Sequence, residues 1–294
     1  MKKRIKGYRQ LADELKKAGV VIGEPVSGCV YDVISINGVR TGKDSVVCKV
    51  YINTPFSTVQ SEYLAASKAY AADPEHFMRV YGRPLLFTVR DLTFGGINKC
   101  SAVLFEKGVP LSTGSDPIRL DWYVSFLRDI AAAAETLHRL GIVHLDIKPG
   151  NIVSSNGRYC LIDFNISKFI GYGDEINLLT HMGSGFYMAP DIFNGVLSGA
   201  CDVYSLGMTV RGILLRDVGS MRGSYADDLL AQKKALEPLH SDDPDIQKFL
   251  DLINHMTAFS VGNRIRSMSE VIRELATLRI DPHTRLYSAY ESAG

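Results

Sequence analysis

Four polar residues near the middle of the chain are of the types that could do chemistry on a phosphate ester. The stretch "GIVHLDIKPGNIV" (Gly141–Val153) places Asp146, Lys148 and Asn151 within six residues, and Asp163 follows Asn151 by 12 residues at the end of an apolar run. Phosphoryl transfer needs a carboxylate that orients an attacking hydroxyl, oxygen ligands for Mg²⁺ and a cation beside the moving phosphate. A polar turn could gather the first three residues by chance, but it would rarely be followed by such an Asp. These residues therefore predict phosphoryl-transfer chemistry.

A second stretch, "IGEPVSGCVY" (Ile22–Tyr31), could bind the phosphates of a nucleotide. Gly23 and Gly28 lie five residues apart between β-forming residues, and Val30 follows. A phosphate-binding loop of the GxGxxGxV kind would have a glycine at the place of Pro25. Hairpins with two glycines and no ligand are common, so this stretch alone leaves both interpretations open.

The elements that must position these residues differ between the two parts of the chain. Alternating runs typical of strands occupy residues 19–36, 45–51, 85–92 and 101–106. Helical patterns occupy residues 57–72, 122–140, 203–215, 225–236, 244–259 and 267–278. The chain is therefore predicted to have an α+β fold, with a small β-rich lobe followed by a larger, mainly helical lobe.

Composition limits the partners and the compartment. The 294 residues are 46% hydrophobic, which is enough to form a core, and 33 Lys and Arg nearly balance 32 Asp and Glu, so no nucleic-acid partner is expected. The later part of the chain has an excess of acidic residues, which favours either a basic partner or a solvated surface. Five scattered cysteines without CxxC spacing indicate a reducing, intracellular compartment, the cytoplasm or the nucleus. Neither a membrane span nor a secretory signal is expected, since no apolar run approaches 18 residues.

Five motifs resemble those of eukaryotic-type protein kinases in their residues, in their order along the chain and in their spacing, across roughly residues 19–279. "HLDIKPGN" is similar to the catalytic loop HRDxKxxN, and "DFN" is similar to the magnesium-binding DFG. "GSGFYMAPD" resembles the end of an activation segment, "DVYSLG" the helix behind the catalytic loop, and "VVCK" the strand motif VAIK. The glycine hairpin lies where a kinase has its glycine-rich loop, with Gly28 21 residues before Lys49. Compact kinases of large DNA viruses, baculoviruses among them, or of bacterial effectors have a similar style, which would place the protein in a host cell.

The resemblance implies a role for each matching residue. Asp146 would orient the substrate hydroxyl and accept its proton, and Lys148 would stabilise the transferred phosphoryl group. Asn151 and Asp163 would bind Mg²⁺, for which Mn²⁺ is an alternative, against the phosphates of ATP.

The resemblance also implies catalytic roles outside the central stretch. Lys49 would contact the α- and β-phosphates of ATP, and Glu62, the only acidic residue in Ser57–Ala72, would hold it in place. The alternative for Glu62 is a solvated helix residue. A lysine two residues after Asp146 and the hydroxyl of Ser184 favour serine and threonine substrates over tyrosine.

The nucleotide would lie in a pocket whose residues follow from the same resemblance. Glu106 to Gly108 would form the hinge that binds adenine, and Phe105 would lie at the back of the pocket. Val30, Val47 and Val153 would enclose the adenine, and simple core packing is their alternative role. The residues implied to bind the nucleotide, besides Lys49, are Ile22, Gly23, Gly28, Val30, Val47, Phe105, Glu106, Gly108 and Val153.

Two further pairings follow from the resemblance. Asp202 would brace the backbone of the catalytic loop. Asp191, which stands in place of a longer glutamate, would pair with either Arg264 or Arg266, and the sequence does not decide between them.

Three other departures from the kinase pattern affect phosphate binding and control. Pro25 removes a backbone N–H from the hairpin and so weakens its contribution to phosphate binding. Asn165 replaces the glycine of DFG, and asparagine tolerates a left-handed backbone better than most residues. Leu145 replaces the arginine that pairs with a phosphorylated activation loop in many kinases, so a phosphate on Thr180 would lack its usual partner.

The loop is therefore expected to be held by packing of Phe186 and Tyr187 in an enzyme that is active as synthesised. The alternative is that Lys168 takes the place of the missing arginine.

Two other classes of function remain as alternatives. A pseudokinase scaffold would share the fold, but such proteins usually lose the counterparts of Lys49, Asp146 or Asp163. A small-molecule phosphotransferase of the aminoglycoside or choline kinase type uses a similar catalytic loop but lacks the "YMAPD" platform for a peptide. A protein substrate is therefore expected, the acidic excess of the later part favours a basic one, and the oligomeric state stays open.

The expected domains are a basic N-terminal extension (1–18), an N-lobe (19–107), a C-lobe (108–279) and a C-terminal tail (280–294). The extension has the pattern of an amphipathic helix. It could pack on the N-lobe, form a dimer contact or bind an anionic surface.

Overall fold

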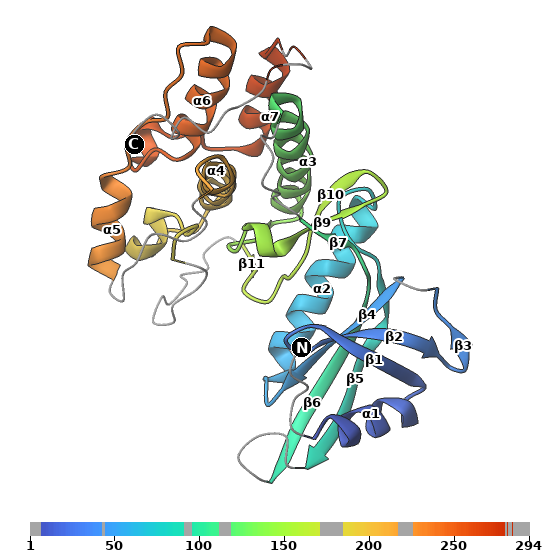
Figure 1. Ribbon diagram of the computed structural model, residues 1–294. Coiled ribbons are helices and arrows are strands. Elements are labelled where there is room, and N and C mark those ends of the chain that lie inside the picture. Colours follow the sequence, from blue (N-terminus) through green and yellow to red (C-terminus); the bar gives the residue numbers. More distant parts are fainter. Residues whose placement is uncertain are drawn as a thin grey trace, which may run out of the picture. The chain divides into compact units, whose positions relative to one another are not determined.

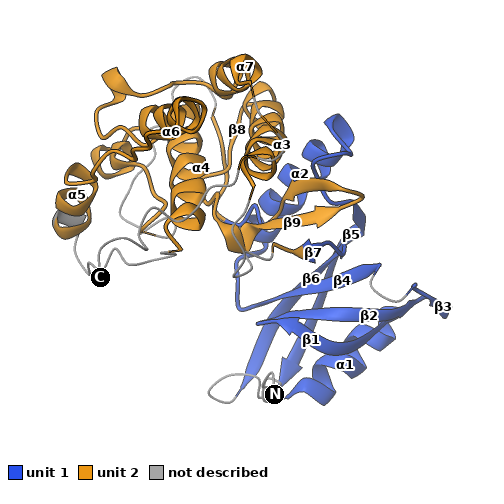
Figure 2. Ribbon diagram, turned by 45° about the horizontal axis from the view of Figure 1, so that its top comes forward, with its two compact units in different colours: residues 1–109, 163–165 blue, residues 110–162, 166–294 orange. Residues whose placement is uncertain are grey.

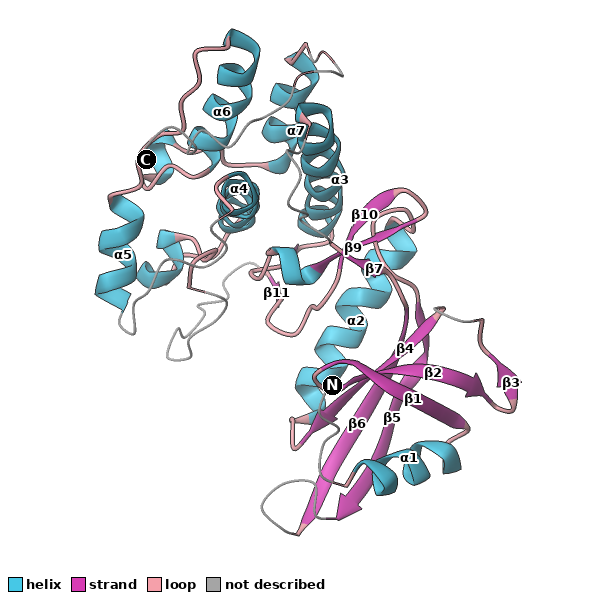
Figure 3. Cartoon of the chain, viewed as in Figure 1, coloured by secondary structure: helices cyan, strands magenta, loops and turns pink. Residues whose placement is uncertain are grey.

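The structure is a computed structural model that describes residues 7–42, 45–90, 96–111, 119–170, 185–216, 226–279, 281 and 284. It divides into two compact units (Figure 2): unit 1 is Met1–Val109 with Asp163–Asn165, and unit 2 is Pro110–Ile162 with Ile166–Gly294. The main sheet lies in unit 1, and unit 2 is mainly helical (Figure 3). The predicted α+β class, with a β-rich part before a helical part, is confirmed.

Unit 1 is built on an antiparallel sheet (Figure 1) with the order β1-β2-β4-β6-β5, to which β3 is added beside β2. The strands are β1 (Val20–Ser27), β2 (Val30–Ile36), β3 (Val39–Arg40), β4 (Val46–Ile52), β5 (Val80–Arg90) and β6 (Ile97–Glu106). β5 begins before the predicted position at residue 85, because a register shift between Tyr81 and Leu85 interrupts the alternation that the sequence pattern relies on.

The two faces of this sheet are covered by different helices. α1 (Tyr8–Lys17) packs on β1 and β5, and α2 (Phe56–Ala72) packs on β5 and β6. Strand side chains alternate between faces, and Cys48 of β4 packs in a cluster with α1, whereas Tyr51 packs in a cluster with Val59 of α2. Lys49 therefore lies on the α2 face, opposite α1.

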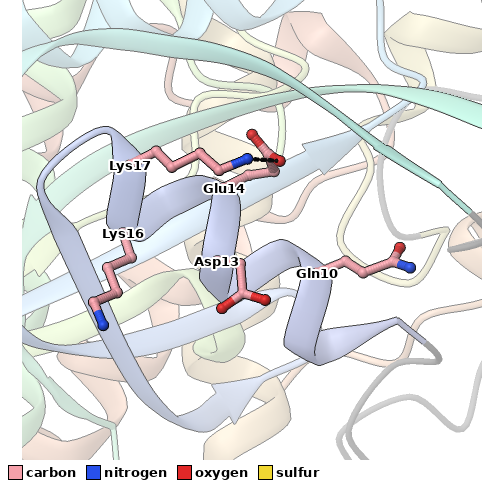
Figure 4. Close-up of a pocket in the computed structure, with 5 residues that line it drawn as sticks. All are labelled: Gln10, Asp13, Glu14, Lys16 and Lys17. Atoms are coloured by element: carbon pink, nitrogen blue, oxygen red, sulfur yellow. Dashed lines mark hydrogen bonds and ion pairs between the residues drawn. The ribbon is translucent and has the colours of Figure 1, made fainter.

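α1 is the predicted N-terminal amphipathic helix, and it packs on unit 1. Leu11 and Leu15 on its apolar face are both 0% exposed, and the hydroxyl of Tyr8 donates to the carbonyl of Gly23 at 2.7 Å. Of the three placements that the sequence left open, the structure shows the packed one. Figure 4 shows the polar face, where a shallow hollow is bordered by hydrophilic side chains, with Lys17 paired to Glu14 at 2.6 Å.

Unit 2 is organised around α4, which is buried along nearly its whole length. Its helices are α3 (Leu120–Arg139), α4 (Gly199–Leu214), α5 (Ala226–Lys234), α6 (Pro244–Met256) and α7 (Met268–Thr277). A Cβ at Gly207 would lie 2.8 Å from Met256 of α6, so only glycine permits this close helix approach. Each predicted helix is present, and no helix in the described part of the chain is long and apolar enough to cross a membrane.

Short elements of unit 2 connect these helices to the catalytic-type motifs. β8 (Ile142–Val143) pairs with β11 (Lys168–Phe169), and β9 (Ile152–Ser155) pairs with β10 (Arg158–Leu161). The order of the second small sheet is β10-β9-β7, where β7 is Val109–Pro110. In the described part of unit 2, the 3₁₀ helices η1 (Pro149–Asn151), η2 (Pro190–Asn194) and η3 (Val261–Asn263) complete the connections.

We predict that Leu11→Ala destabilises unit 1 by about 3 kcal/mol, since truncating a fully buried leucine costs about 2–5 kcal/mol. Urea unfolding followed by fluorescence would measure the change. Gln10→Ala, on the exposed side of the same helix, is the control and should change stability by less than about 0.5 kcal/mol. Equal effects of the two variants would show that α1 does not belong to the cooperative core.

Candidate active site

The structure joins three of the predicted residues in unit 1. Lys49 Nζ lies 2.6 Å from Glu62 Oε1 and 2.8 Å from Asp163 Oδ1. β4 positions Lys49, α2 positions Glu62, and Asp163 lies at the start of the DFN stretch. A lysine between two carboxylates, one of them 1% exposed, is an anchored cation that could stabilise phosphate charge.

Burial and charge act in opposite directions on this group. Burial lowers the pKa of Lys49, but the charges of Glu62 and Asp163 outweigh it and raise the pKa overall, so the ammonium stays protonated. Burial raises the pKa of Glu62, and the charge of Lys49 opposes that rise. Tyr51 adds a contact that sequence reasoning missed, since its ring centroid lies 5.2 Å from Lys49 Nζ. It is two residues from Lys49 on the same strand face, so strand alternation could have indicated it.

The DFN stretch is anchored by its aromatic residue. Phe164 is buried, and its ring lies 6.0 Å from that of Phe77. Asp163 has a φ of 68°, whereas Asn165 is not among the described residues with positive φ. The left-handed residue of this stretch is therefore Asp163, and the tolerance of asparagine for that conformation is not used at position 165.

The glycine hairpin has an irregular edge strand. β1 pairs with β2 through three register shifts, which lie on both sides of Ile22 and Pro25. Gly28 has a φ of 49° and open space at the Cβ position, so it makes the tight turn. Val30 pairs with Lys49 across β2 and β4, but Ile22 packs in the buried cluster with α1.

The predicted hinge residues follow β6. Phe105 packs with Tyr51 and Val103 in the α2-side cluster. The backbone N–H of Glu106 donates to the carbonyl of Arg79 at 2.8 Å, and its carboxylate accepts from the N–H of Arg79 at 3.3 Å. Among the other residues predicted to bind the nucleotide, Val47 pairs with Phe105 across the sheet, Gly108 follows β6, and Val153 is a buried residue of β9 in unit 2.

In unit 2, a buried carboxylate holds the backbone of the segment 144–151, which carries the motif HLDIKPGN and is here called the catalytic-type loop. Asp202 of α4 is 0% exposed and accepts from the N–H groups of His144 and Leu145, each at 2.8 Å. The ring nitrogen Nε2 of His138 lies 2.9 Å from the same carboxylate. Burial would raise the pKa of Asp202, but these hydrogen bonds and the charge of His138 lower it overall. The sequence predicted the bracing role of Asp202 but missed His138, whose position at the end of a predicted helix was the available signal.

The braced loop presents the predicted polar residues together. Lys148 Nζ lies 2.7 Å from Asp146 Oδ2, and Asn151 Nδ2 donates to the same oxygen at 2.7 Å and to the carbonyl of Asp146 at 2.9 Å. Because its amide nitrogen is used in this way, the amide oxygen of Asn151 is the atom suited to bind a cation. The N–H of Ile162 donates to the carbonyl of Asn151 at 3.0 Å, which ties the end of β10 to the same loop.

The end of the segment "GSGFYMAPD" is also held in unit 2. Arg264 forms a buried ion pair with Asp191, which decides between the two arginines that the sequence left open. Leu145 packs in a buried cluster with Tyr187 and Met188 of this segment. Ser184 and Thr180 lie outside the described residues.

Comparison with known protein families identifies the family of this chain. The model of the protein kinase domain matches residues 113–286, more than half of the chain. The chain belongs to the protein kinase family. The match includes the catalytic-type loop, DFN and Asp202, whereas Lys49 and Glu62 precede it. For those two residues the ion pair in the structure is the supporting observation.

Relatives of this kinase domain come from several kinds of organism. A probable LIM domain-containing serine/threonine-protein kinase of Dictyostelium discoideum is 29% identical over 74% of this chain and 32% of its own length. Serine/threonine-protein kinase mos of Xenopus laevis is 31% identical over 35% of this chain and 32% of its own length. The probable serine/threonine-protein kinase PknB of Lactococcus lactis is 25% identical over 55% of this chain and 26% of its own length. The aligned stretches thus cover about a third or less of the length of these relatives. The likeness of this chain to compact viral or effector kinases stays a prediction.

We predict that Asp202→Asn destabilises unit 2 by about 3 kcal/mol at pH 7, because the amide NH₂ would face a buried backbone N–H. The folded-state pKa of Asp202 is lowered, so its contribution is present above the unfolded value of 3.8 and is lost as the pH falls through the folded value. The stability difference between the two proteins should therefore shrink below about pH 4. Urea unfolding across pH measures it, with exposed Asp251→Asn as the control. A difference that does not change with pH would contradict this role.

Proposed function

We propose that the protein transfers the γ-phosphate of ATP to serine and threonine hydroxyls of protein substrates in a Mg²⁺-dependent reaction. The observation that supports this most directly is the Lys49 ammonium between Glu62 and Asp163, at 2.6 and 2.8 Å. Placing a cation against the phosphates is the main work of a protein in this reaction class, because catalysis there is positioning and charge stabilisation. Loss of this cation would be expected of a scaffold, so the intact pair argues against the pseudokinase alternative.

The residues also fit a magnesium ion. No group of three or more His, Cys, Asp or Glu side chains in the described part of the chain could bind a metal alone. Mg²⁺ suits such a site, because it is usually bound by one or two carboxylates together with substrate phosphates. Asp163 and Asn151 would hold it, and Mn²⁺ is an alternative. The bound ion would neutralise charge on the phosphates.

The remaining residues divide the work of positioning. Asp146 would orient the attacking hydroxyl, with Lys148 and Asn151 fixing its carboxylate, as their contacts of 2.7 Å suggest. The N–H groups of the hairpin near Gly28 would add to phosphate binding. Val30, Val47 and Val153 would contact the adenine. Ile22 is left out of this pocket, because its side chain packs under α1.

Protein substrates are favoured over small molecules by the segment that ends at Asp191. The buried ion pair between Asp191 and Arg264 and the packing of Tyr187 and Met188 hold the backbone of this segment in place. Small-molecule phosphotransferases have no use for such a peptide platform. The names of the relatives and Lys148 favour serine and threonine as acceptors. A basic substrate and an intracellular site of action are further proposals, supported by the acidic later part of the chain and by five cysteines without CxxC spacing.

We further propose that activity does not need a phosphate on the activation loop. Leu145, at the position of the phosphate-binding arginine, is 2% exposed and packs among Tyr187, Met188 and Ala189. An aliphatic side chain cannot form the charge-assisted hydrogen bonds by which a phosphate orders a loop. Apolar burial supplies that ordering here.

Lys49→Met and Asp146→Asn should each lower kcat by at least about a hundredfold, because each removes a group needed in the transition state. Asp146→Asn should still bind ATP·Mg²⁺ in calorimetric titration, whereas Lys49→Met should bind it more weakly. Lys16→Met, an exposed residue of α1, is the control and should leave both quantities unchanged. Wild-type protein that binds no nucleotide at millimolar ATP would overturn the proposed function, as would a mutant with near wild-type transfer.

Protein treated with phosphatase and shown by mass spectrometry to be unmodified should keep most of its initial rate on a basic protein. Thr180→Ala should do the same. A loss of tenfold or more in both, about 1.4 kcal/mol of transition-state stabilisation, would show that a loop phosphate is needed and that Leu145 does not replace it.

A further inference from the structure

A buried lysine of α5 contacts the segment that the proposed function assigns to the peptide. Lys233 is 1% exposed, and its ammonium donates to the backbone carbonyl of Phe186 at 2.7 Å. Phe186 belongs to the segment 185–191, here called the platform, which ends at Asp191. The ammonium also lies 5.1 Å from the ring centroid of Tyr204.

A second contact joins the same helix to the same segment. A Cβ at Gly185 would lie 3.0 Å from Leu229 Cδ1, so Leu229 of α5 packs directly against the backbone there. α5 also contacts η2, which begins at Pro190. One helix thus touches the platform near its start, through Leu229 and Lys233, and again near its end.

Burying a lysine is costly, so its retention needs a compensating contact. Burial and then the charge of Arg264 lower the pKa of Lys233 to about 7. The guanidinium of Arg264 lies 4.9 Å from the ring of Tyr204, so two cations share one aromatic ring. Arg264 has Asp191 as its own partner, and the Phe186 carbonyl is the acceptor for Lys233. An apolar residue would fill this space at lower cost, and only a donor can fix the carbonyl.

We propose that Lys233 is a positioning residue for protein substrates, acting by fixing the Phe186 carbonyl and so the backbone of the platform. This rests on the proposed function, because the platform matters for catalysis only if a peptide docks there. The ammonium of Lys233 contacts the platform and Tyr204 of α4, and neither belongs to the residues proposed to bind ATP. Its loss should therefore affect the KM for the protein substrate and leave the KM for ATP unchanged.

The test compares Lys233→Met with Lys234→Met, the adjacent lysine, which is exposed. Lys233→Met keeps the stem of the side chain and removes the ammonium. We expect the KM for a peptide substrate to rise about tenfold, the loss of one charge-assisted hydrogen bond, with kcat and the KM for ATP within about twofold of wild type. Lys234→Met should match wild type throughout. An unchanged peptide KM, or equal changes in the KM values for peptide and ATP, would overturn the proposal.

Hydrogen exchange of the amides of residues 185–189 gives a readout that does not depend on activity. Exchange there should be faster in Lys233→Met than in wild type, and unchanged in Lys234→Met. Leu229→Ala, which loosens the other contact of α5, should change exchange in the same direction and keeps the test available if Lys233→Met folds poorly. If the wild-type protein has no activity on peptides, the proposed function is overturned. In that case faster exchange would still support fixing of the platform, and unchanged exchange would overturn it.

The pH dependence supplies a third readout. Arg264 is the charged group that acts on Lys233, and the charges of Arg264, Arg211 and Asp191 act on the neighbouring Tyr204. The ammonium form of Lys233 bonds the carbonyl more strongly than the neutral amine. The ratio of peptide KM values, Lys233→Met over wild type, should therefore be larger at pH 6 than at pH 8.5. A ratio that rises with pH would contradict this role.

Discussion

The geometry of the catalytic-type loop depends on one buried carboxylate. Asp202 accepts hydrogen bonds from the backbone of His144 and Leu145, and His138 lies beside it. Leaving such a carboxylate unpaired in the interior would cost several kcal/mol, so the three donors and the acceptor determine each other's positions. Leu145 has a φ of 67°, which costs a residue with a branched side chain about 1–2 kcal/mol. The hydrogen bond from its N–H to Asp202 stabilises that conformation. Because Asp146 is the next residue along the chain, the position of its backbone depends on the same bond.

Leu145, the left-handed residue, also connects the catalytic-type loop to the platform. Its backbone is fixed by Asp202, while its side chain lies in the apolar cluster that includes Tyr187 and Met188. An arginine at this place could not be buried without a counterion. The leucine packs there without a charged partner, so its contact with the platform depends only on folding. The departure from the family pattern is consistent with its surroundings, because the neighbouring residues in the cluster are also apolar.

Residues whose chemistry is specific could be predicted from the sequence, and those whose choice depends on backbone geometry could not. Few reactions other than phosphoryl transfer need Asp146, Asn151 and Lys49 at their spacing, and the structure places Lys49 beside Glu62 as expected. The choice of Arg264 over Arg266 depends on the path of a loop that no periodicity describes. Ile22 packs under α1 because register shifts in β1 remove the simple alternation that would have placed its side chain. The positive φ of Asp163 left no signal either, since aspartate occurs in many other conformations.

The contacts around Tyr204 extend this reasoning to the platform. Arg264 and Lys233 lie near the same ring, one paired with Asp191 at the end of the platform and the other bonded to Phe186 near its start. Two cations near one another repel, and an acceptor on the platform offsets this for each of them. Arg264 also donates to the carbonyls of Ala258 and Phe259. Since both acceptors belong to one short segment, movement of that segment would separate Lys233 from its carbonyl and Arg264 from its carboxylate. The cost of that movement is set by contacts of the fold itself, and this is the physical basis of the proposal that activity does not need a phosphate on the loop.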